Sequence, residues 1–251
     1  MNLKIAILGE GKTDYGYYDY DRWIEGPVQL IIRRLLCDFN IEFVPITKND
    51  LKTIAAFQGR YKKPKFPGHG MNVNRLCTFL AVNRKDVDLI IYYTDTDKET
   101  GVSASEREAK SRFDNIYADI VTAFKSQTVY LGIPLVPIRM IESWLLGDES
   151  AFIQAYGSLP VSPGLPKQPE FVWGDESNPN SNHPKALLKR VLAQYHKSSC
   201  IEEYNLITEG MNINTLMRKC SYSFNKFVED LNNCKLILQQ QRKEAAPHLL
   251  D

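Results

Sequence analysis

The stretch LIIYYTDTD at residues 89–97 decides the fold of this chain, because an apolar run in it leads directly into two carboxylates. Its first five residues have the β-branched and aromatic character of a fully buried strand. The stretch IAILGEGKTD at residues 5–14 repeats the arrangement, with an apolar run that stops at Glu10. Strands that end in acids predict an α/β protein, since ligands bind at the carboxyl ends of the strands in open parallel sheets.

The pattern of strands and helices continues along the chain. We expect strands at 4–8, 42–46, 88–93 and 132–138, and helices at 27–38, 73–82, 103–125, 139–148, 185–194, 213–231 and 236–246. This alternation favours a mainly parallel sheet flanked by helices. Pro134 and Pro137 favour either an edge position for the last strand or a strand end at these residues.

A change in composition separates two parts of the chain. Residues 157–184 are rich in Pro, Ser, Asn and Gly, which is typical of an irregular segment. We therefore predict an α/β core at 1–156, and an irregular Pro-rich segment with a helical C-terminal extension packed on that core at 157–251.

Composition narrows the class of protein. The 251 residues are 43% hydrophobic and 24% charged, as in an ordinary globular protein, and the net charge of +1 neither supports nor excludes nucleic acid as a partner. The five cysteines form no zinc motif, and their odd number without a secretory signal favours the reducing cytoplasm. No apolar run approaches the roughly 20 residues that span a bilayer, so we expect no membrane partner.

The acids after the two strands are candidate metal ligands. Asp95 and Asp97 alternate along an extended chain and so point to one side, where a hard cation such as Mg²⁺ would relieve their repulsion. Glu10 lies between two glycines in a predicted sharp turn. The alternative is that Asp95 and Asp97 only cap the segment that follows. Glu142, after the fourth strand, either reaches the same site or is a first-turn helix acid.

These motifs resemble those of Toprim domains. GEGKTD at 9–14 is similar to their Glu-Gly-x-Thr-Asp/Glu motif, and YYTDTD at 92–97 is similar to their later Asp-x-Asp motif. The chain also resembles a bacterial Toprim-like family often linked to phage defence, through the GHG loop at 68–70, IESWLLGD at 141–148 and SFNKF at 223–227.

The resemblance implies a Rossmann-like Toprim core and separate roles for the acids. Glu10 would be the general acid/base or help to bind metal, and Asp95 and Asp97 would bind Mg²⁺ (or Mn²⁺). Topoisomerases in this group add a tyrosine nucleophile from another domain. Here the tyrosines at 15–20 more often indicate a packing or stacking surface.

A basic segment is a candidate nucleic-acid contact. It combines cations with aromatic rings and ends in a histidine; the predicted contacts are Lys12, Arg60, Lys62, Lys63, Lys65 and His69. The alternative is a solvated loop. Lys12 does not belong to a P-loop, because the Gly-x-x-x-x-Gly-Lys spacing is missing.

The resulting hypothesis is Mg²⁺-dependent cleavage of phosphodiester bonds in nucleic acid, with a role in anti-phage defence. One alternative is a catalytically silent or partner-dependent regulatory module that works with an ATPase. A third is a small-molecule phosphotransferase, which the neutral net charge leaves open.

Overall fold

A computed structural model describes residues 2–9, 11–58, 66, 68–96, 105–127 and 129–245. Several predicted site residues lie outside these ranges: Glu10, Asp97, Arg60, Lys62, Lys63 and Lys65. The geometry below is therefore that of the remaining candidates and of the residues around them.

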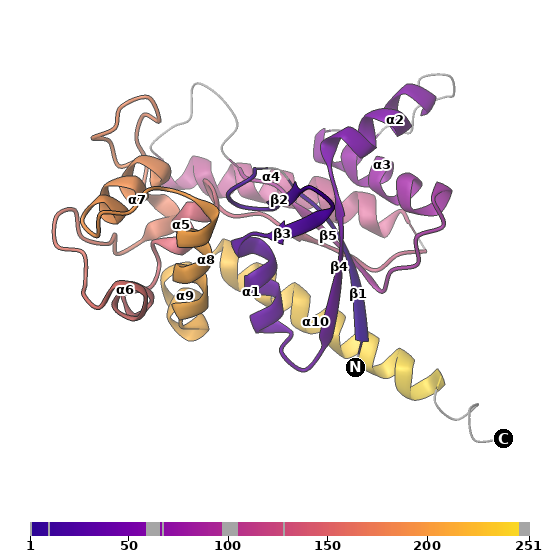
Figure 1. Cartoon of the computed structure of the whole chain (residues 1–251). Helices are drawn as coiled ribbons and strands as arrows, with labels where there is room; N and C mark the ends of the chain where they lie inside the picture. The colour runs from indigo at the N-terminus through magenta and orange to yellow at the C-terminus, as the bar shows by residue number, and fades with distance from the viewer. Residues whose placement is uncertain are drawn as a thin grey trace.

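A parallel sheet forms the centre of the described structure, with strand order β4-β1-β5-β6 (Figure 1). The strands are β1 (Asn2–Leu8), β4 (Asn40–Ile46), β5 (Leu89–Tyr93) and β6 (Gly132–Leu135). This confirms the predicted α/β class and places β6 at an edge, as Pro134 indicated. The chain goes first to one side of β1 and then to the other, so the topological switch point lies between β1 and β5.

Helices cover both faces of the sheet, because alternate residues of β1 point to opposite sides. Ala6 and Leu8 face α2 (Lys48–Gln58), α3 (Gly68–Val82) and α4 (Glu106–Lys125). Ile5 and Ile7 face α1 (Pro27–Leu35) and α10 (Ser223–Ala245). The result is a three-layer α/β/α core.

The remaining helices gather beside the α1 face, on the left of Figure 1. They are α5 (Ile141–Leu145), α6 (Glu149–Tyr156), α7 (Pro184–Ala193), α8 (Ile201–Gly210) and α9 (Ile213–Lys219), with a 3₁₀ turn at Pro169–Phe171. Their buried side chains belong to the same hydrophobic cluster as α1 and the sheet. No helix in the described ranges is long and apolar enough to cross a membrane.

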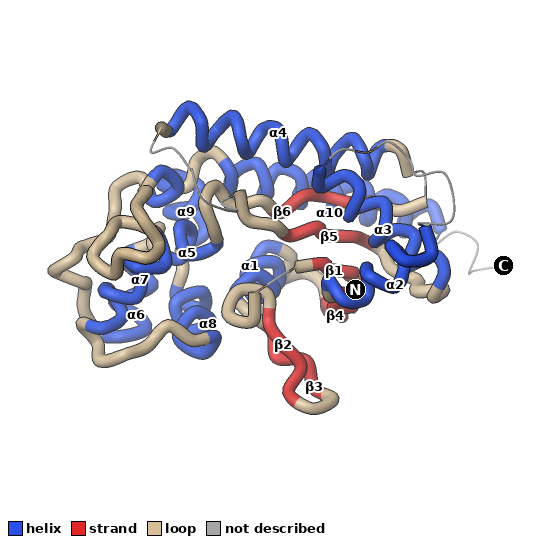
Figure 2. Tube along the Cα trace, turned by 90° about the horizontal axis from the view of Figure 1, so that it is seen from above, coloured by secondary structure: helices blue, strands red, loops and turns tan. Residues whose placement is uncertain are grey.

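The aromatic stretch after β1 forms a hairpin that the sequence did not predict. Strands β2 (Gly16–Asp19) and β3 (Arg22–Glu25) pair in antiparallel fashion and project from the body (Figure 2). Tyr15 packs on Trp23 at the base with ring centroids 5.0 Å apart, whereas Tyr20 at the tip is 95% exposed. Only part of the tyrosine-rich segment is therefore a packing surface.

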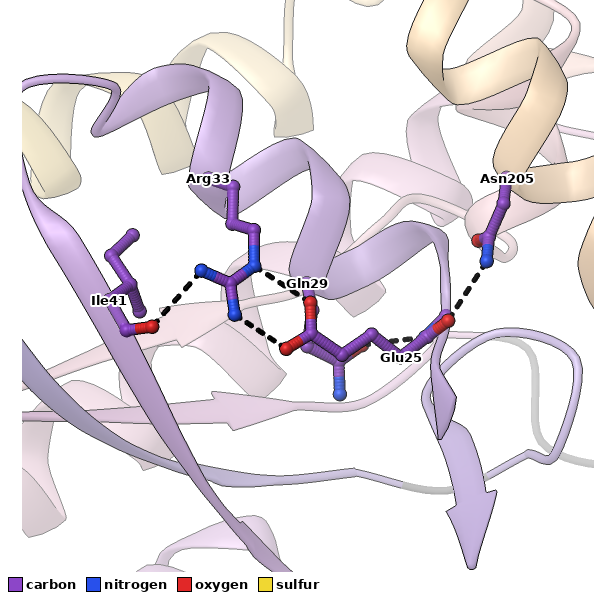
Figure 3. A network of polar contacts seen from close by, with 6 residues as sticks. Glu25, Gln29, Arg33, Ile41 and Asn205 are labelled. Atoms are coloured by element: carbon purple, nitrogen blue, oxygen red, sulfur yellow. Dashed lines mark hydrogen bonds and ion pairs between the residues drawn. The ribbon is translucent and has the colours of Figure 1, made fainter. Parts of the chain in front are cut away.

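Polar contacts fix the base of the hairpin to three other elements (Figure 3). Arg33 of α1 donates two hydrogen bonds to the Glu25 carboxylate, at 2.7 and 2.6 Å, and a third to the carbonyl of Ile41 in β4. Asn205 of α8 donates to the Glu25 carbonyl at 2.9 Å. A bidentate arginine contact fixes orientation as well as distance, so the segment that leads into α1 has a defined path.

Some predicted elements have different bounds. The prediction of a single helix at 213–231 is wrong, because α9 ends at Lys219 and a new helix, α10, starts at Ser223. The helix expected at 139–148 is reduced to α5, since Arg139 has a left-handed backbone (φ 66°) that a helix does not allow. Helices α2, α6 and α8 were not predicted.

Tyr15 joins the ends of two strands, and its hydroxyl group predicts a measurable loss on removal. It donates to the Ile7 carbonyl at 2.5 Å and accepts from the Ile46 amide at 2.9 Å, both buried. Tyr15→Phe leaves that amide without its partner and should lower the free energy of unfolding by about 1–3 kcal/mol. Urea denaturation measures this, with the exposed Tyr20→Phe as control; equal stability of the two variants would contradict the assignment.

Candidate active site at the carboxyl edge of the sheet

The turn after β1 brings Asp14 into the protein interior. Gly11 has a φ of +93°, which favours glycine, and its carbonyl accepts a hydrogen bond from the Tyr15 amide at 3.0 Å. Thr13 donates to the Asp14 carboxylate at 2.9 Å. A Cβ atom at Gly26 would lie 2.4 Å from the Asp14 carbonyl, so only glycine permits this close approach. Asp14 is 5% exposed as a result.

Asp95 follows β5 at the neighbouring strand end and shares a partner with Asp14. The Tyr93 hydroxyl donates to Asp95 Oδ1 at 3.0 Å and lies 3.5 Å from Asp14 Oδ2. A phenol has one proton, so the shorter contact with Asp95 is the stronger one. The two carboxylates therefore lie on either side of one hydroxyl group at the switch point.

Glu142 reaches the same place from α5. All five residues of α5 are buried, and Trp144 on this helix donates from Nε1 to Ser223 Oγ at 3.0 Å. Residues two positions apart point to nearly opposite sides of a helix, so the anchored Trp144 directs Glu142 away from α10. Tyr204 of α8 donates to Glu142 Oε1 at 3.4 Å. Glu142 Oε2 is buried and has no hydrogen-bond partner among the described residues.

We call Asp14, Asp95 and Glu142 the acid cluster, because each lies close enough to the others for their charges to affect the pKa of Glu142. Burial raises the pKa of Glu142 well above the usual value, and the charges of Asp14 and Asp95 raise it further. Burial also raises the pKa of Asp14, against the hydrogen bond from Thr13 and the charge of Lys185. The Tyr93 pKa is raised by burial and by all three acids, so its hydroxyl stays a proton donor.

Lys185 supplies the neighbouring positive charge. It follows Pro184 in the first turn of α7, and its side chain is 45% exposed and 3.6 Å from Glu176. Burial lowers the pKa of Lys185, but Glu142, Glu176, Asp14 and Asp95 outweigh this effect and the net shift is upward. Lys185 is thus a partly exposed cation near the acid cluster, from the C-terminal part of the chain.

The structure unites some predicted site residues and leaves others apart. Asp95 and Glu142 lie close enough for their charges to interact, which is compatible with the first of the two interpretations of Glu142. Glu10 and Asp97, which follow Gly9 and Thr96, lie outside the described residues. Sequence reasoning assigned no role to Asp14, Tyr93, Lys185 or Tyr204. Asp14 was visible as the last residue of the GEGKTD motif, but nothing in the sequence indicated that Lys185 and Tyr204 approach the sheet.

The predicted nucleic-acid contacts occupy two settings. Lys12 is exposed in the turn after β1. His69 lies in the first turn of α3, where its Nδ1 is 3.1 Å from the Tyr92 hydroxyl. The basic residues at 60–65 fall in the part of the chain that the structure does not describe.

The donor chemistry of the site suits a hard divalent cation, although its present geometry is not that of a complete metal centre. Across the described ranges, no three His, Cys, Asp or Glu side chains lie close enough to hold one metal ion. The buried Glu142 Oε2 still has an unused lone pair, and all three acids offer the oxygen ligands that Mg²⁺ prefers. Glu10 and Asp97 are the further ligands that the sequence predicts.

A carboxylate held in this way costs folding free energy, which leads to a prediction for Glu142→Gln. The ionised form of Glu142 is disfavoured in the folded state, so a neutral side chain of the same shape should stabilise the metal-free protein. We expect the melting temperature in EDTA to rise by about 2–4 °C, or roughly 1 kcal/mol. Glu149→Gln, an exposed acid at the start of α6, is the matched control. A lower melting temperature for Glu142→Gln would show that the carboxylate stabilises the folded protein.

A comparison with known protein families gives a match for this chain. Residues 27–232 match a domain of unknown function (DUF4276). The chain belongs to this family. The DUF4276 match starts with α1 and ends within α10, so it includes Asp95, Glu142 and Lys185, whereas Asp14 precedes it. Searches of curated proteins and of solved structures found no match.

Proposed function

We propose that this DUF4276 protein hydrolyses phosphodiester bonds of nucleic acid with the help of bound Mg²⁺ (or Mn²⁺). The observation that supports this most is the acid cluster, in which three separate elements bring carboxylates to the switch point of the sheet. Carboxylates with pKa values perturbed by one another are more frequent at functional sites than elsewhere. The edge of the sheet where they meet is also the usual ligand site of such folds.

The proposed roles follow from the chemistry of a phosphodiester. Asp95, Asp97, Glu10 and Glu142 would hold the metal ion, with Asp14 beside them. When bound, the ion neutralises phosphate charge and lowers the pKa of a water molecule. Glu10 transfers the proton as general acid/base.

The residues behind the acids maintain the site. The Tyr93 hydroxyl orients Asp95, and Tyr204 orients Glu142. Lys185 offers a cation to a phosphate at the same edge of the sheet. The Toprim-like motifs at 9–14 and 92–97 support the same assignment and favour a role in phage defence. An ATPase partner belongs to the alternative of a regulatory module. Free thiols at all five cysteines are consistent with our proposal of a cytoplasmic protein.

The first experiment is a cleavage assay combined with calorimetry. The purified chain is incubated with DNA and RNA, single- and double-stranded, in Mg²⁺, Mn²⁺ or EDTA, and metal binding is titrated separately. We expect metal binding and cleavage that EDTA abolishes. Binding without cleavage would favour the partner-dependent regulatory module, and turnover of nucleotides alone would favour the phosphotransferase. Absence of metal binding would overturn the proposal.

A further inference from the structure

A second concave site lies beside the acid cluster, on the opposite face of the sheet. It opens between the ends of β1 and β5 and the helices α2 and α3, which lie side by side in Figure 1. Its volume is about 220 Å³. Sites for drug-sized ligands measure roughly 300–1,000 Å³, so this pocket has room for a single ring system and its substituents.

The walls of this pocket combine apolar surface with cations. Leu51 and the ring of Tyr92 provide the apolar part, and Lys48, Lys52 and Arg75 provide the charge. The described residues that line the pocket include no Asp or Glu. We call this site the basic pocket. Its composition suits a ligand that has both a flat ring and a negative charge.

Arg75 contributes one of the cations in the wall of the pocket. Its Nη1 donates to Asn72 Oδ1 at 3.4 Å, a long contact to a neutral group. Its Nε is buried and has no hydrogen-bond partner among the described residues. Asn72 in turn donates to the Tyr92 hydroxyl at 3.3 Å, so the arginine is attached to the aromatic wall through one side chain. Arg75 lines the pocket, so a phosphate there would meet its guanidinium group.

Lys52 and Lys48 occupy one turn of α2 at the mouth of the pocket. The start of this helix is defined by reciprocal contacts between Thr47 and Asp50, with the Thr47 amide 2.7 Å from the Asp50 carboxylate. Lys52 is exposed and donates to Asn49 Oδ1 at 3.0 Å. The lysines thus stand on a capped helix, where a phosphate entering the pocket would meet them.

The basic pocket and the acid cluster share the same strand ends. Tyr93 and Thr94 line the pocket, while the Tyr93 hydroxyl contacts Asp95 and Asp14. Gly9, which also lines the pocket, directly precedes Glu10. A chain of nucleotides that crosses this edge of the sheet would pass from one site to the other.

We infer that the basic pocket binds one nucleotide of the substrate, with its base against Leu51 and Tyr92 and its phosphate at Arg75 and Lys52. The inference rests on the proposed function, because it makes the pocket the neighbour of the phosphodiester that is cleaved. Binding by stacking is tolerant of base identity, so the pocket selects nucleotides over other anions and does not select one base.

The test measures binding of AMP, adenosine and inorganic phosphate by calorimetry in EDTA, where no cleavage takes place. We expect AMP to bind at least about tenfold more tightly than adenosine or phosphate. Arg75→Met should weaken AMP binding by about 10- to 100-fold, the range for loss of a hydrogen bond to a charged group. Lys52→Met should weaken it less, and Lys125→Met, an exposed cation at the end of α4, should leave it unchanged.

Three results would overturn the inference: no AMP binding, phosphate binding as tight as that of AMP, or AMP affinity unaltered in both pocket variants. Because Lys52 is exposed, we expect Lys52→Met to fold normally, so it still tests the inference if Arg75→Met does not fold. The two proposals fail separately. If AMP binding depends on Arg75 but no metal-dependent cleavage is found, the proposed function is wrong and the assignment of the basic pocket stands. If cleavage is found without AMP binding, the assignment of the pocket is wrong and the proposed function stands.

Discussion

Asp95→Asn is expected to reduce Mg²⁺-dependent cleavage of nucleic acid by at least about a hundredfold. Substitution of residues that merely support a metal ligand typically costs 10- to 100-fold, and Asp95 is assigned as a ligand itself. Asparagine preserves the shape of the side chain and an oxygen that can accept from Tyr93 at the position of Oδ1, 3.0 Å away. The loss should therefore appear in activity and metal affinity rather than in folding.

The control for this substitution is Asp86→Asn. Asp86 is exposed and precedes the other end of β5, so it changes the net charge equally at a distance from the site. Glu10→Gln and Asp97→Asn extend the test to the two further acids that the sequence predicts as metal ligands. Full activity in both Asp95→Asn and Glu10→Gln would remove the assignment of the site.

Glu142→Gln adds a second readout to the same experiment. It should lose activity while it gains stability in EDTA, and Mg²⁺ should stabilise the unmodified chain more than the variant. A residue with a purely structural role would lose stability and activity together. The opposite signs of the two effects therefore separate a catalytic carboxylate from a structural one.

Glu170→Ala is expected to have the largest effect on stability, at least about 3 kcal/mol. The Glu170 carboxylate is fully buried and accepts from the backbone amides of Tyr222, Ser223 and Phe224, at 3.0, 2.8 and 3.3 Å. These are the amides that begin α10, where a negative charge is favourable. Alanine leaves buried donors without a partner, each at a cost of about 1–3 kcal/mol.

Thermal denaturation measures this effect, and a fall of about 6–12 °C corresponds to 3 kcal/mol for a chain of this size. Glu229→Ala, an exposed acid on α10, is the control and should change stability by less than about 0.5 kcal/mol. A second variant, Ser223→Ala, should also destabilise the protein, because Ser223 Oγ accepts from the Ile138 amide and from Trp144 Nε1. Wild-type stability of Glu170→Ala would show that another group caps α10.

The contacts around Glu170 also connect stability to the candidate site. Ser223 holds Trp144, and Trp144 fixes the rotation of α5 that directs Glu142 toward Asp14 and Asp95. Loss of the cap should therefore disturb the position of Glu142. We expect activity in Glu170→Ala to fall even at temperatures where the protein is still folded.

Local sequence was sufficient to predict the four strands of the parallel sheet and the position of Asp95 at its carboxyl edge. The runs at 5–8 and 89–93 contain only apolar and aromatic residues and no charged ones. They therefore form buried strands, as is typical of a parallel sheet. Asp95 follows such a run and must lie at the carboxyl edge of the sheet. The same logic placed Pro134 at an edge strand, since proline cannot donate to a neighbouring strand.

The tertiary structure alone decided which groups meet those acids. Glu142, Lys185 and Tyr204 belong to α5, α7 and α8, and their approach to the sheet depends on how these helices pack in the shared hydrophobic cluster. The periodicity of the sequence does not predict how close these helices come to the sheet, because the packing of distant elements depends on the sum of many apolar contacts. The sequence by itself thus determined the α/β sheet and its acidic edge. Only the packing of α5 and α7 decided that a third carboxylate, Glu142, and Lys185 lie beside that edge.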